Sequence, residues 1–497
     1  MKKMNHHLML CLFSCLFFIS HAHSTSTSST SSGQFCSPDQ SSALLQPRQE
    51  FVKGMPSDYY NGSYPKMMSW KADTDCCSWN GVTCDTKNGQ VIGLNLRNSH
   101  LYGPLNSNSS LFSLRHLQKL NLGFNNFSSS TIPSEFGQLV NLTHLNLSHS
   151  VFSGQIPPFI SNLSQLTHLS LSSNNFHGQL PSFFGNLTQL EELDISRNQL
   201  KGSIPFEIST LSHLSNLYLS CNSLTGAIPS FLFTMHSLLK LDPSQNQLTG
   251  PLKFQNISSS LLCYLSLSRN NLNEQVPKSI ANLTGLEYLL LSSINVKGKM
   301  ELNMFFKLRE LRFLDLSGNN LLISKEYINS TLPKFSKLWL SSCNLREFPD
   351  FLEAQNELIY LDLSNNSIEG KIPKWYWNVG KETLQSLNLS INLLSNFEQP
   401  LKVLPWKNMV YLDLCANMLQ GPLPIPPLST RYFFAASNNL TGRISPMICK
   451  ANSLQILELS NNQLIGKIPQ RLGNFSSSLL VLNMRNNCFK EICLKHS

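Results

Sequence analysis

The strongest constraint on this chain is a short unit that repeats along most of its length. Residues 190–205 read LEELDISRNQLKGSIP, which has the form LxxLxLxxNxLxGxIP. The same form returns as LSNLYLSCNSLTGAIP at 214–229 and as LIYLDLSNNSIEGKIP at 358–373. Its asparagine recurs every 24 residues, at Asn174, Asn198, Asn222, Asn246 and Asn270. Self-similarity at a fixed period of this size predicts a solenoid of stacked coils.

Each position of the unit has a physical role. The alternating leucines of LxxLxL point from a short strand into the core, and the residues between them point outward. The asparagine falls where the strand ends, and its amide can satisfy backbone groups of neighbouring coils. Gly and Ile-Pro suit a tight return on the outer side. The pattern predicts a leucine-rich-repeat solenoid: an α/β horseshoe, or right-handed superhelix, with a parallel sheet on its concave face and irregular or 3-10 segments on its convex side.

The asparagine position, followed along the chain, predicts 17 coils. It is occupied by Ser99, Asn125, Ser150, Asn174, Asn198, Asn222, Asn246, Asn270, Ile294, Asn319, Cys343, Asn366, Asn392, Asn417, Asn438, Asn462 and Asn487. Weak points are expected at Pro243, which removes a strand donor, and at Ile294, which cannot bridge coils. Cys343 is expected to be a buried, unreactive thiol. Segments 300–311, 323–335 and 396–408 lack GxIP and are expected to form short helical or irregular bulges.

The N-terminal region carries a targeting signal. MKKMNHH is followed by the apolar run LMLCLFSCLFFI, and Ser20-His21-Ala22 fits a cleavage site. Residues 1–22 are therefore predicted to be a secretory signal peptide, and 23–34 a Ser/Thr-rich leader. No later apolar run has the length of a spanning helix. Lys and Arg total 38 against 29 acids, but the charges are scattered, which indicates solubility and a mild preference for acidic partners and argues against nucleic-acid binding.

Four cysteines, Cys36, Cys76, Cys77 and Cys84, cluster before the first coil. The signal peptide directs them to an oxidising compartment, which favours disulfides. The spacing of CCSWNGVTC resembles a zinc site only loosely, so no metal is expected. Four cysteines allow three pairings, and the spacing alone does not choose among them.

Several segments resemble one family. CSPDQSSALL at 36–45, SWKADTDCCSWNGVTCD at 69–85 and GQVIGLNL at 89–96 resemble the N-terminal cap of plant leucine-rich-repeat receptors. SNSSLFSLRHLQKLNL at 107–122 and LSSCNLREFPDFL at 340–352 resemble plant receptor-like proteins of the Cf disease-resistance type. The resemblance implies a cap at 35–88 with Cys36–Cys76 and Cys77–Cys84 disulfides, repeats at 89–487 and a non-repeat tail at 488–497. Pro47 falls within the expected cap helix and is expected to shorten or kink it.

The resemblance also implies a function. Such proteins are extracellular receptors of plant defence without a kinase, which bind a protein, peptide or glycan ligand and signal through an adaptor or co-receptor kinase. They sit at the plasma membrane on a single helix, whereas this sequence as written is expected to enter the apoplast. The alternatives are a secreted inhibitor of microbial cell-wall-degrading enzymes and a non-functional truncated decoy. The tail CFKEICLKHS replaces an expected return, which predicts a C-terminal truncation of the family pattern.

No catalytic signature or cofactor motif is present, and the chain is expected not to be an enzyme. Acidic residues do line the inner face, at Glu191, Glu192, Asp194, Asp242, Asp315, Asp362 and Asp413. Paired carboxylates suit glycosidase chemistry, but these occupy a solvent-facing repeat position, which favours a surface role. His144 and His168 take equivalent positions on adjacent coils and suit either a pH sensor or a simple recurrence of LTHL.

A column of large side chains is expected along the inner face. The residue before LxL is Tyr264, Tyr288, Phe313, Lys337 and Tyr360 in five successive coils, with Trp339 and Asp362 beside it. Exposed aromatic side chains on a concave surface are typical of binding hot spots, so these seven residues are the predicted ligand-binding surface. The alternative is that tyrosine is simply common at this repeat position.

N-x-S/T sequons are predicted to carry glycans in a secreted chain. The predicted sites are Asn61, Asn108, Asn126, Asn141, Asn162, Asn186, Asn256, Asn282, Asn329, Asn365, Asn388, Asn439 and Asn474. Asn146 also lies in a sequon, but it is expected mid-strand on the inner face, where a sugar would block ligand contact.

Overall fold

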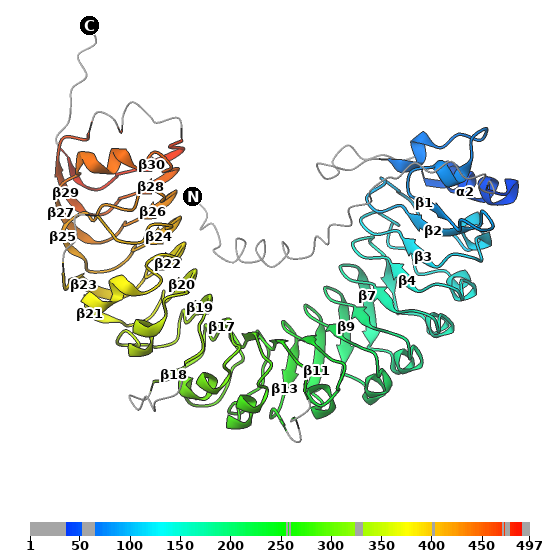
Figure 1. The fold of residues 1–497 in the computed structure, drawn as a ribbon, viewed down its shortest axis with the longest axis horizontal. Coiled ribbons are helices and arrows are strands. Elements are labelled where there is room, and N and C mark those ends of the chain that lie inside the picture. The colour runs from blue at the N-terminus through cyan, green and yellow to red at the C-terminus, as the bar shows by residue number, and fades with distance from the viewer. Residues whose placement is uncertain are drawn as a thin grey trace, which may run out of the picture.

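The computed structural model describes residues 36–489, apart from 52–64, 255–256, 258–259, 324–331, 400–402, 470–471 and 473–477. The predicted signal peptide and leader lie outside the described residues. The coils stack into an open arc, with the N-terminal cap at one end and the last coils at the other (Figure 1). The strands line the inner side of this arc, as a leucine-rich-repeat horseshoe requires.

The concave face is one 18-stranded sheet. β1 (Val82–Cys84) is antiparallel to β2, and every later strand pairs in parallel with the strand one repeat away, as Leu193 does with Leu217. The predicted number of coils is confirmed by the strands that follow β1. They are β2 (Val91–Asn95), β3 (Lys119–Asn121), β4 (His144–Asn146), β6 (His168–Ser170), β8 (Glu192–Asp194), β10 (Asn216–Tyr218), β12 (Lys240–Asp242), β14 (Tyr264–Ser266), β15 (Tyr288–Leu290), β17 (Phe313–Asp315), β19 (Lys337–Trp339), β20 (Tyr360–Asp362), β22 (Ser386–Asn388), β24 (Tyr411–Asp413), β26 (Tyr432–Phe434), β28 (Ile456–Glu458) and β30 (Val481–Asn483).

The repeat asparagines tie neighbouring coils together as predicted. Nδ2 of Asn198 donates to the carbonyls of Leu171 in the preceding coil and of Ile195 in its own coil, at 3.0 and 3.1 Å. Its Oδ1 accepts from the backbone N–H of Phe176 at 3.0 Å. A single buried side chain therefore satisfies backbone groups of two coils that no strand or helix bond reaches.

The coils without asparagine solve the same problem differently. At Ile294 the backbone takes over, because Leu272 N–H donates to the Ile294 carbonyl at 3.0 Å. In the next coil the Oδ1 of Asn319 is buried without a hydrogen-bond partner, so this junction is imperfect. The thiol of Cys343 donates to the carbonyls of Leu316 and Ser341, at 3.3 and 3.4 Å, as an asparagine amide would. Burial raises the pKa of this thiol to about 12, which agrees with the expected unreactive cysteine.

Pro243 also has the expected effect on the sheet. β12 pairs with β14 over two residues, whereas β14 and β15 pair over three. The carbonyl of Pro243 nevertheless accepts Nδ2 of both Asn246 and Asn270, at 3.1 Å each. The proline therefore removes one donor without interrupting the asparagine ladder.

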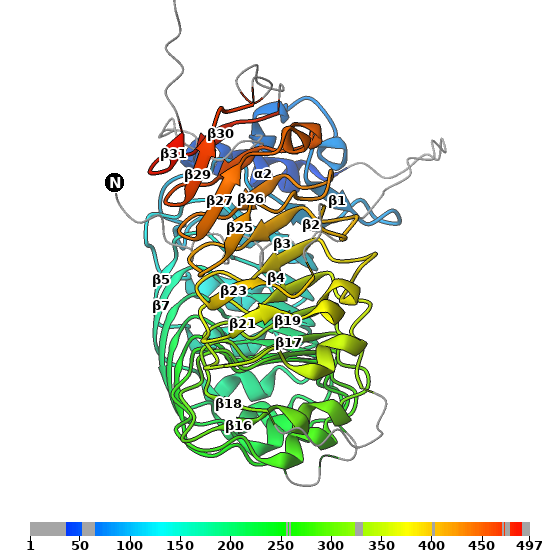
Figure 2. The same ribbon diagram turned by 90° about the vertical axis from the view of Figure 1, so that its left-hand side faces the viewer.

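A second set of parallel strands follows the asparagine and was not predicted from the sequence. These strands form sheets of five, four, two and two strands beside the main sheet, and Figure 2 shows β25, β27, β29 and β31 stacked near the C-terminal end. Their formation explains the recurring Leu-x-Gly, because glycine adopts positive φ there, as at Gly202 (83°). They are β5 (Ser153–Gly154), β7 (Asn175–Gln179), β9 (Gln199–Gly202), β11 (Ser223–Ala227), β13 (Gln247–Thr249), β16 (Met300–Glu301), β18 (Leu321–Leu322), β21 (Glu369–Ile372), β23 (Leu393–Phe397), β25 (Gln420–Pro422), β27 (Asn439–Arg443), β29 (Gln463–Gly466) and β31 (Cys488–Phe489).

Short 3-10 helices complete the outer part of many coils, as expected. One of them, η10 (Leu302–Lys307), fills the predicted bulge at 300–311, while much of 323–335 lies outside the described residues. The others in the repeats are η3 (Ser110–Ser113), η4 (Ser134–Gln138), η5 (Pro158–Asn162), η6 (Ser182–Asn186), η7 (Phe206–Thr210), η8 (Ser230–Phe233), η9 (Lys278–Asn282), η11 (Asp350–Ala354), η12 (Lys374–Asn378) and η13 (Pro446–Lys450).

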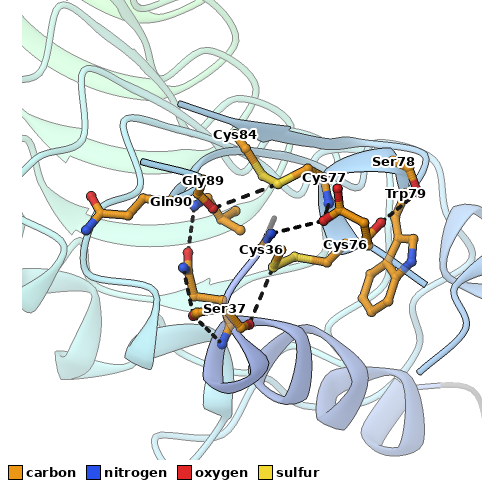
Figure 3. The surroundings of a disulfide bond; sticks show 12 residues. Cys36, Ser37, Cys76, Cys77, Ser78, Trp79, Cys84, Gly89 and Gln90 are labelled. Carbon is orange, nitrogen blue, oxygen red and sulfur yellow. Dashed lines mark hydrogen bonds between the residues drawn. A yellow bond between two sulfur atoms is a disulfide. The ribbon is translucent and has the colours of Figure 1, made fainter. Parts of the chain in front are cut away.

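The N-terminal cap covers the apolar end of the first coil. It contains helix α2 (Pro38–Phe51) and the 3-10 helices η1 (Lys66–Ser69) and η2 (Cys76–Ser78). The implied Cys36–Cys76 and Cys77–Cys84 disulfides are both present (Figure 3). Between them, Oδ1 of Asp75 accepts the N–H groups of Cys36 and Cys77, at 3.0 and 3.1 Å.

Two expectations about chain segments are refined by the structure. Helix α2 continues through Pro47 to Phe51, so this proline does not end the helix. Pro47 is buried and lines a small apolar cavity between α2 and the first coils, together with Leu44, Trp70 and Leu94. At the other end, Cys488 and Phe489 form β31 beside β29, so regular pairing continues past Asn487.

Candidate ligand-binding surface

The parallel register brings the predicted column together. Tyr264, Tyr288, Phe313, Lys337 and Tyr360 face one another in sequence across β14, β15, β17, β19 and β20. A second column runs beside it, in which Trp339 lies between Asp315 and Asp362. All seven residues of the predicted surface are therefore neighbours on one stretch of the concave sheet, hereafter the aromatic ladder.

The rings of the ladder are in contact along its length. Ring centroids are 6.0 Å apart for Tyr264 and Tyr288, and 6.4 Å for Tyr288 and Phe313. Phe313 meets Trp339 edge to face at 4.8 Å. The ammonium of Lys337 lies 5.5 Å from the Phe313 ring centroid and 5.2 Å from that of Tyr360. These are aromatic and cation–π distances, so the surface is held in place before any ligand arrives.

Exposure differs along the ladder. Tyr288 is 39% exposed, whereas Phe313 is only 9% exposed. The buried Phe313 ring packs against the rings of Tyr288 and Trp339. Tyr264, Lys337, Trp339 and Tyr360 are half-buried. Burial lowers the pKa of the Lys337 ammonium, because partial removal from water disfavours the charged form. The ladder therefore offers an apolar surface with one cation at its centre, the mixture that anchors peptide side chains well.

The inner-face aspartates do not occupy a freely solvent-facing position, which corrects the expectation from the repeat. Asp315 and Asp413 are buried, and Asp362 is half-buried. Each points its Oδ1 at the backbone two residues ahead, as Asp362 does toward the N–H of Ser364 at 2.8 Å. Burial raises the pKa of Asp315 and of Asp362. These carboxylates stabilise the turn after each strand, so Asp362 has a structural role within the ladder.

A second aromatic group was missed by the sequence reasoning. Tyr411 and Tyr432 continue the first column on β24 and β26, with ring centroids 6.5 Å apart. Phe434 lies 5.5 Å from Tyr411, and the Tyr411 hydroxyl donates to Oδ2 of Asp413 at 3.1 Å. The signal was available in VYLDL and RYFFA, which place aromatic residues at the same repeat positions. Ser386 separates this group from the ladder.

The other predicted sites are placed as follows. His144 and His168 stack directly, with ring centroids 4.4 Å apart. The sequons Asn108, Asn141, Asn162, Asn186, Asn282, Asn365 and Asn439 are exposed, whereas Asn126, Asn146 and Asn388 are half-buried. Asn61, Asn256, Asn329 and Asn474 lie outside the described residues. Cys36, Asp75, Cys76 and Cys77 form the one group with metal-ligand spacing in the described part of the chain, and disulfides engage its three sulfurs.

Comparisons with known proteins agree with this architecture. Residues 94–388 match the family model for a leucine-rich repeat region, 37–85 match the leucine-rich repeat N-terminal domain, and 453–475 match a single leucine-rich repeat. In Arabidopsis thaliana, Receptor-like protein 47 is 48% identical over 452 residues, which covers 90% of this chain and 52% of the relative. Receptor-like protein 6 is 32% identical over 617 residues, covering 91% and 62%. The chain belongs to the leucine-rich-repeat proteins, and among them to the plant receptor-like proteins.

Solved structures place the same fold in receptor ectodomains. The ectodomain of the plant membrane receptor kinase GASSHO1/SCHENGEN3, in complex with CASPARIAN STRIP INTEGRITY FACTOR 2, is 27% identical, with a TM-score of 0.64 over 90% of this chain and 62% of that one. The receptor kinase HAESA, in complex with the peptide hormone IDA and the co-receptor SERK1, shares the fold at 24% identity and a TM-score of 0.60, covering 91% of this chain and 90% of that one.

The chain spans roughly half to three fifths of the length of the curated relatives named here. Within the part of the chain that the structure describes, no helix combines the length and apolar character needed to cross a bilayer.

Proposed function

We propose that this protein is an extracellular, receptor-like recognition protein of plant defence signalling, which binds a peptide or protein ligand on the aromatic ladder. It passes the signal to a separate adaptor or co-receptor kinase. The observation that carries the proposal is the continuous contact from Tyr264 to Tyr360, with Lys337 at its centre. Preformed aromatic surfaces lose little conformational entropy on binding, which makes them efficient anchors.

The chemistry of the inner face supports recognition over catalysis. The buried aspartates are engaged in turn hydrogen bonds, and Trp339 separates Asp315 from Asp362 in the register. Their engagement in these turns supports a structural role over the free, opposed pair of carboxylates that glycosidase chemistry uses. The plant receptor-like relatives, and the neighbour of known structure in complex with CASPARIAN STRIP INTEGRITY FACTOR 2, support a ligand-binding role.

The test is affinity capture with the secreted, glycosylated chain as bait. Apoplastic fluid from infected and uninfected leaves is passed over the wild type, over the Tyr288→Ala/Trp339→Ala variant and over Phe206→Ala, which removes an exposed aromatic side chain on η7, outside the concave sheet. We expect a peptide or protein that the wild type and Phe206→Ala retain and the double variant loses. Each ladder substitution is expected to weaken its binding by more than about 1 kcal/mol while secretion stays normal.

Two results would contradict the proposal. Equal affinity of the double variant and the wild type for the captured molecule would remove the ladder from recognition. Capture and inhibition of a microbial wall-degrading hydrolase, without association of any kinase in the plant membrane, would make the protein an inhibitor instead.

A further inference from the structure

The concave face of the first four coils differs chemically from the rest of the sheet. The strands β2, β3, β4 and β6 and the turns that directly follow them, all of them described, contain no Asp or Glu. They present amide, ammonium, guanidinium and imidazole groups, hereafter the donor face. Its residues are Asn95, Arg97, Lys119, Asn121, His144, Asn146, His149 and His168. Carboxylates begin with β8, where Glu192 is in register with His168.

The asparagines of this face do the same structural work as the aspartates of later coils. Oδ1 of Asn95, Asn121 and Asn146 accepts the backbone N–H two residues ahead, at 3.1, 3.0 and 2.9 Å. Asp194 makes the same bond to Ser196 at 3.0 Å. Because the turn uses only one oxygen, it is satisfied equally by an amide or a carboxylate.

The difference lies in the second atom of the side chain. In Asn95, Asn121 and Asn146 it is an NH2 group, and none of these three has a protein acceptor among the described residues. In Asp194, Asp315 and Asp362 the equivalent atom is a carboxylate oxygen. Asn95, Asn121 and Asn146 therefore present donors where Asp194, Asp315 and Asp362 present acceptors, although the turn bond forms equally well with either side chain.

Among the described residues, Arg97 and Lys119 of this face take part in none of the ion pairs. The ion pairs of the described residues lie elsewhere: Lys278–Glu301, Lys297–Glu274, Arg312–Glu357 and Lys407–Glu382. The Arg97 guanidinium lies 4.3 Å from the Phe124 ring centroid, and Phe124 stacks on His149 at 4.2 Å. Arg97 is thereby positioned without being neutralised, which leaves its hydrogen-bond donors available to an anion.

The two stacked histidines add outward-facing nitrogens. The Thr143 hydroxyl donates to the Gln118 carbonyl at 3.0 Å and lies 2.9 Å from Nδ1 of His144, so it accepts from the Nδ1–H. Thr167 holds His168 in the same way, through the Thr143 carbonyl. Each neutral ring therefore carries its proton on Nδ1 and keeps Nε2 as an acceptor, so the donors of this face are its amide, ammonium and guanidinium groups.

We propose that the donor face binds the acidic segment of a peptide ligand, whose Asp or Glu carboxylates accept from these donors. This deepens the proposed function and rests on it, because the aromatic ladder would hold the rest of the same peptide. His168 and Tyr264 are four strand steps apart on one sheet. At about 4.8 Å per strand that is roughly 19 Å, which about six extended residues span. This path requires that Asn146, which lies in a sequon on β4, carries no sugar.

The experiment uses the intact secreted glycoprotein and fluorescein-labelled hexaglutamate as the probe, followed by fluorescence anisotropy at low salt. Asn95→Asp/Asn121→Asp keeps both turn bonds and reverses the surface chemistry. Asn483→Asp is the control, because Oδ1 of Asn483 makes the same bond to the Arg485 N–H at 3.2 Å and this residue lies outside the donor face and outside any sequon. We expect the double variant to bind hexaglutamate about tenfold more weakly, and the control to stay within about twofold of wild type.

Further arms separate the alternatives. Tyr288→Ala should bind hexaglutamate as the wild type does, because Tyr288 lies outside the donor face. If this variant loses the natural ligand but keeps the probe, the aromatic ladder and the donor face have been tested independently. Unchanged probe binding in Asn95→Asp/Asn121→Asp overturns the donor face. Three other results would overturn the assignment of an acidic peptide. They are equal binding of hexalysine, tighter binding of an oligogalacturonate with the same number of carboxylates, and a glycan on Asn146 in peptide mapping.

Discussion

At the scale of single residues, the repeat asparagine matters because its side chain replaces backbone partners in two coils. Asn198 is 9% exposed and makes hydrogen bonds on both sides of its amide. Ser150 and Cys343 show that a hydroxyl or thiol supplies the donor half of this role. In the Ser150 coil the acceptor half is shared: the Ser150 carbonyl accepts the Phe127 N–H at 3.0 Å and its hydroxyl accepts the Asn125 N–H at 3.5 Å.

Asn198→Ala should therefore loosen one junction without unfolding the chain. The expected cost is about 1–3 kcal/mol for each buried group left unpaired. Hydrogen exchange should accelerate at Phe176, whose N–H loses its acceptor, and at the flanking strands β6 and β8. Asn175→Ala is the control, because that side chain is exposed. Equal exchange rates at Phe176 in both variants would show that the asparagine hydrogen bonds between coils add nothing to stability.

The buried aspartates predict a dependence of stability on pH. Burial raises the pKa of Asp315 in the folded state, so the folded state binds more protons than the unfolded state above the ordinary Asp pKa. Stability is then favoured at low pH and falls as pH rises through the raised folded pKa. Asp315→Asn keeps the bond to the Ser317 N–H and removes this charge.

The measurement is thermal unfolding of Asp315→Asn and wild type from pH 4 to pH 8. The variant should be the more stable protein at neutral pH, and its advantage should shrink as pH falls and the wild-type carboxyl protonates. A difference that is constant across the pH range would mean that the carboxyl titrates normally.

At the scale of elements, the sequence predicts what the repeat period determines. The leucine positions fix the main strands, and the register of one repeat then places Tyr288 beside Phe313 without further information. The lateral strands β5 to β13 were missed because Leu-x-Gly gives a strand signal too short to stand apart from a loop. The burial of Asp315 was missed because it depends on neighbouring coils, which a single repeat does not reveal.

The two cap disulfides should differ in their contributions. Cys36–Cys76 closes a separation of 40 residues and Cys77–Cys84 one of 7. Loop entropy predicts stabilisation of about 4 and about 2 kcal/mol respectively. Cys36→Ser/Cys76→Ser should therefore be retained in the secretory pathway more completely than Cys77→Ser/Cys84→Ser. Normal secretion of both double variants, measured by immunoblot of medium and cells, would show the cap to be dispensable.

At the scale of the whole molecule, the lateral strands are unevenly distributed along the arc. Lateral sheets of five and four strands reinforce its two ends, β5 to β13 and β25 to β31. Between β13 and β21 the described lateral strands are only β16 and β18. This middle part also holds the unpaired Oδ1 of Asn319 and most of the aromatic ladder. The proposed ligand surface thus lies where the solenoid has the fewest backbone hydrogen bonds outside its main sheet.

Local opening should accordingly be easiest in the middle of the arc. Hydrogen exchange followed by mass spectrometry should show the lateral segments of coils at 271–346 exchanging faster than β7, β9 and β11, because fewer of their amides are paired. A ligand that bridges Tyr264 to Tyr360 should slow this exchange, since it couples five neighbouring coils. Ile294→Asn provides a second test. In the wild type the Leu272 N–H donates to the Ile294 backbone carbonyl, and an asparagine side chain at 294 can restore the missing side-chain hydrogen bonds between coils. Amide protection that is uniform along the arc and unchanged by Ile294→Asn would contradict the idea that the ligand binds the part of the solenoid that opens most easily.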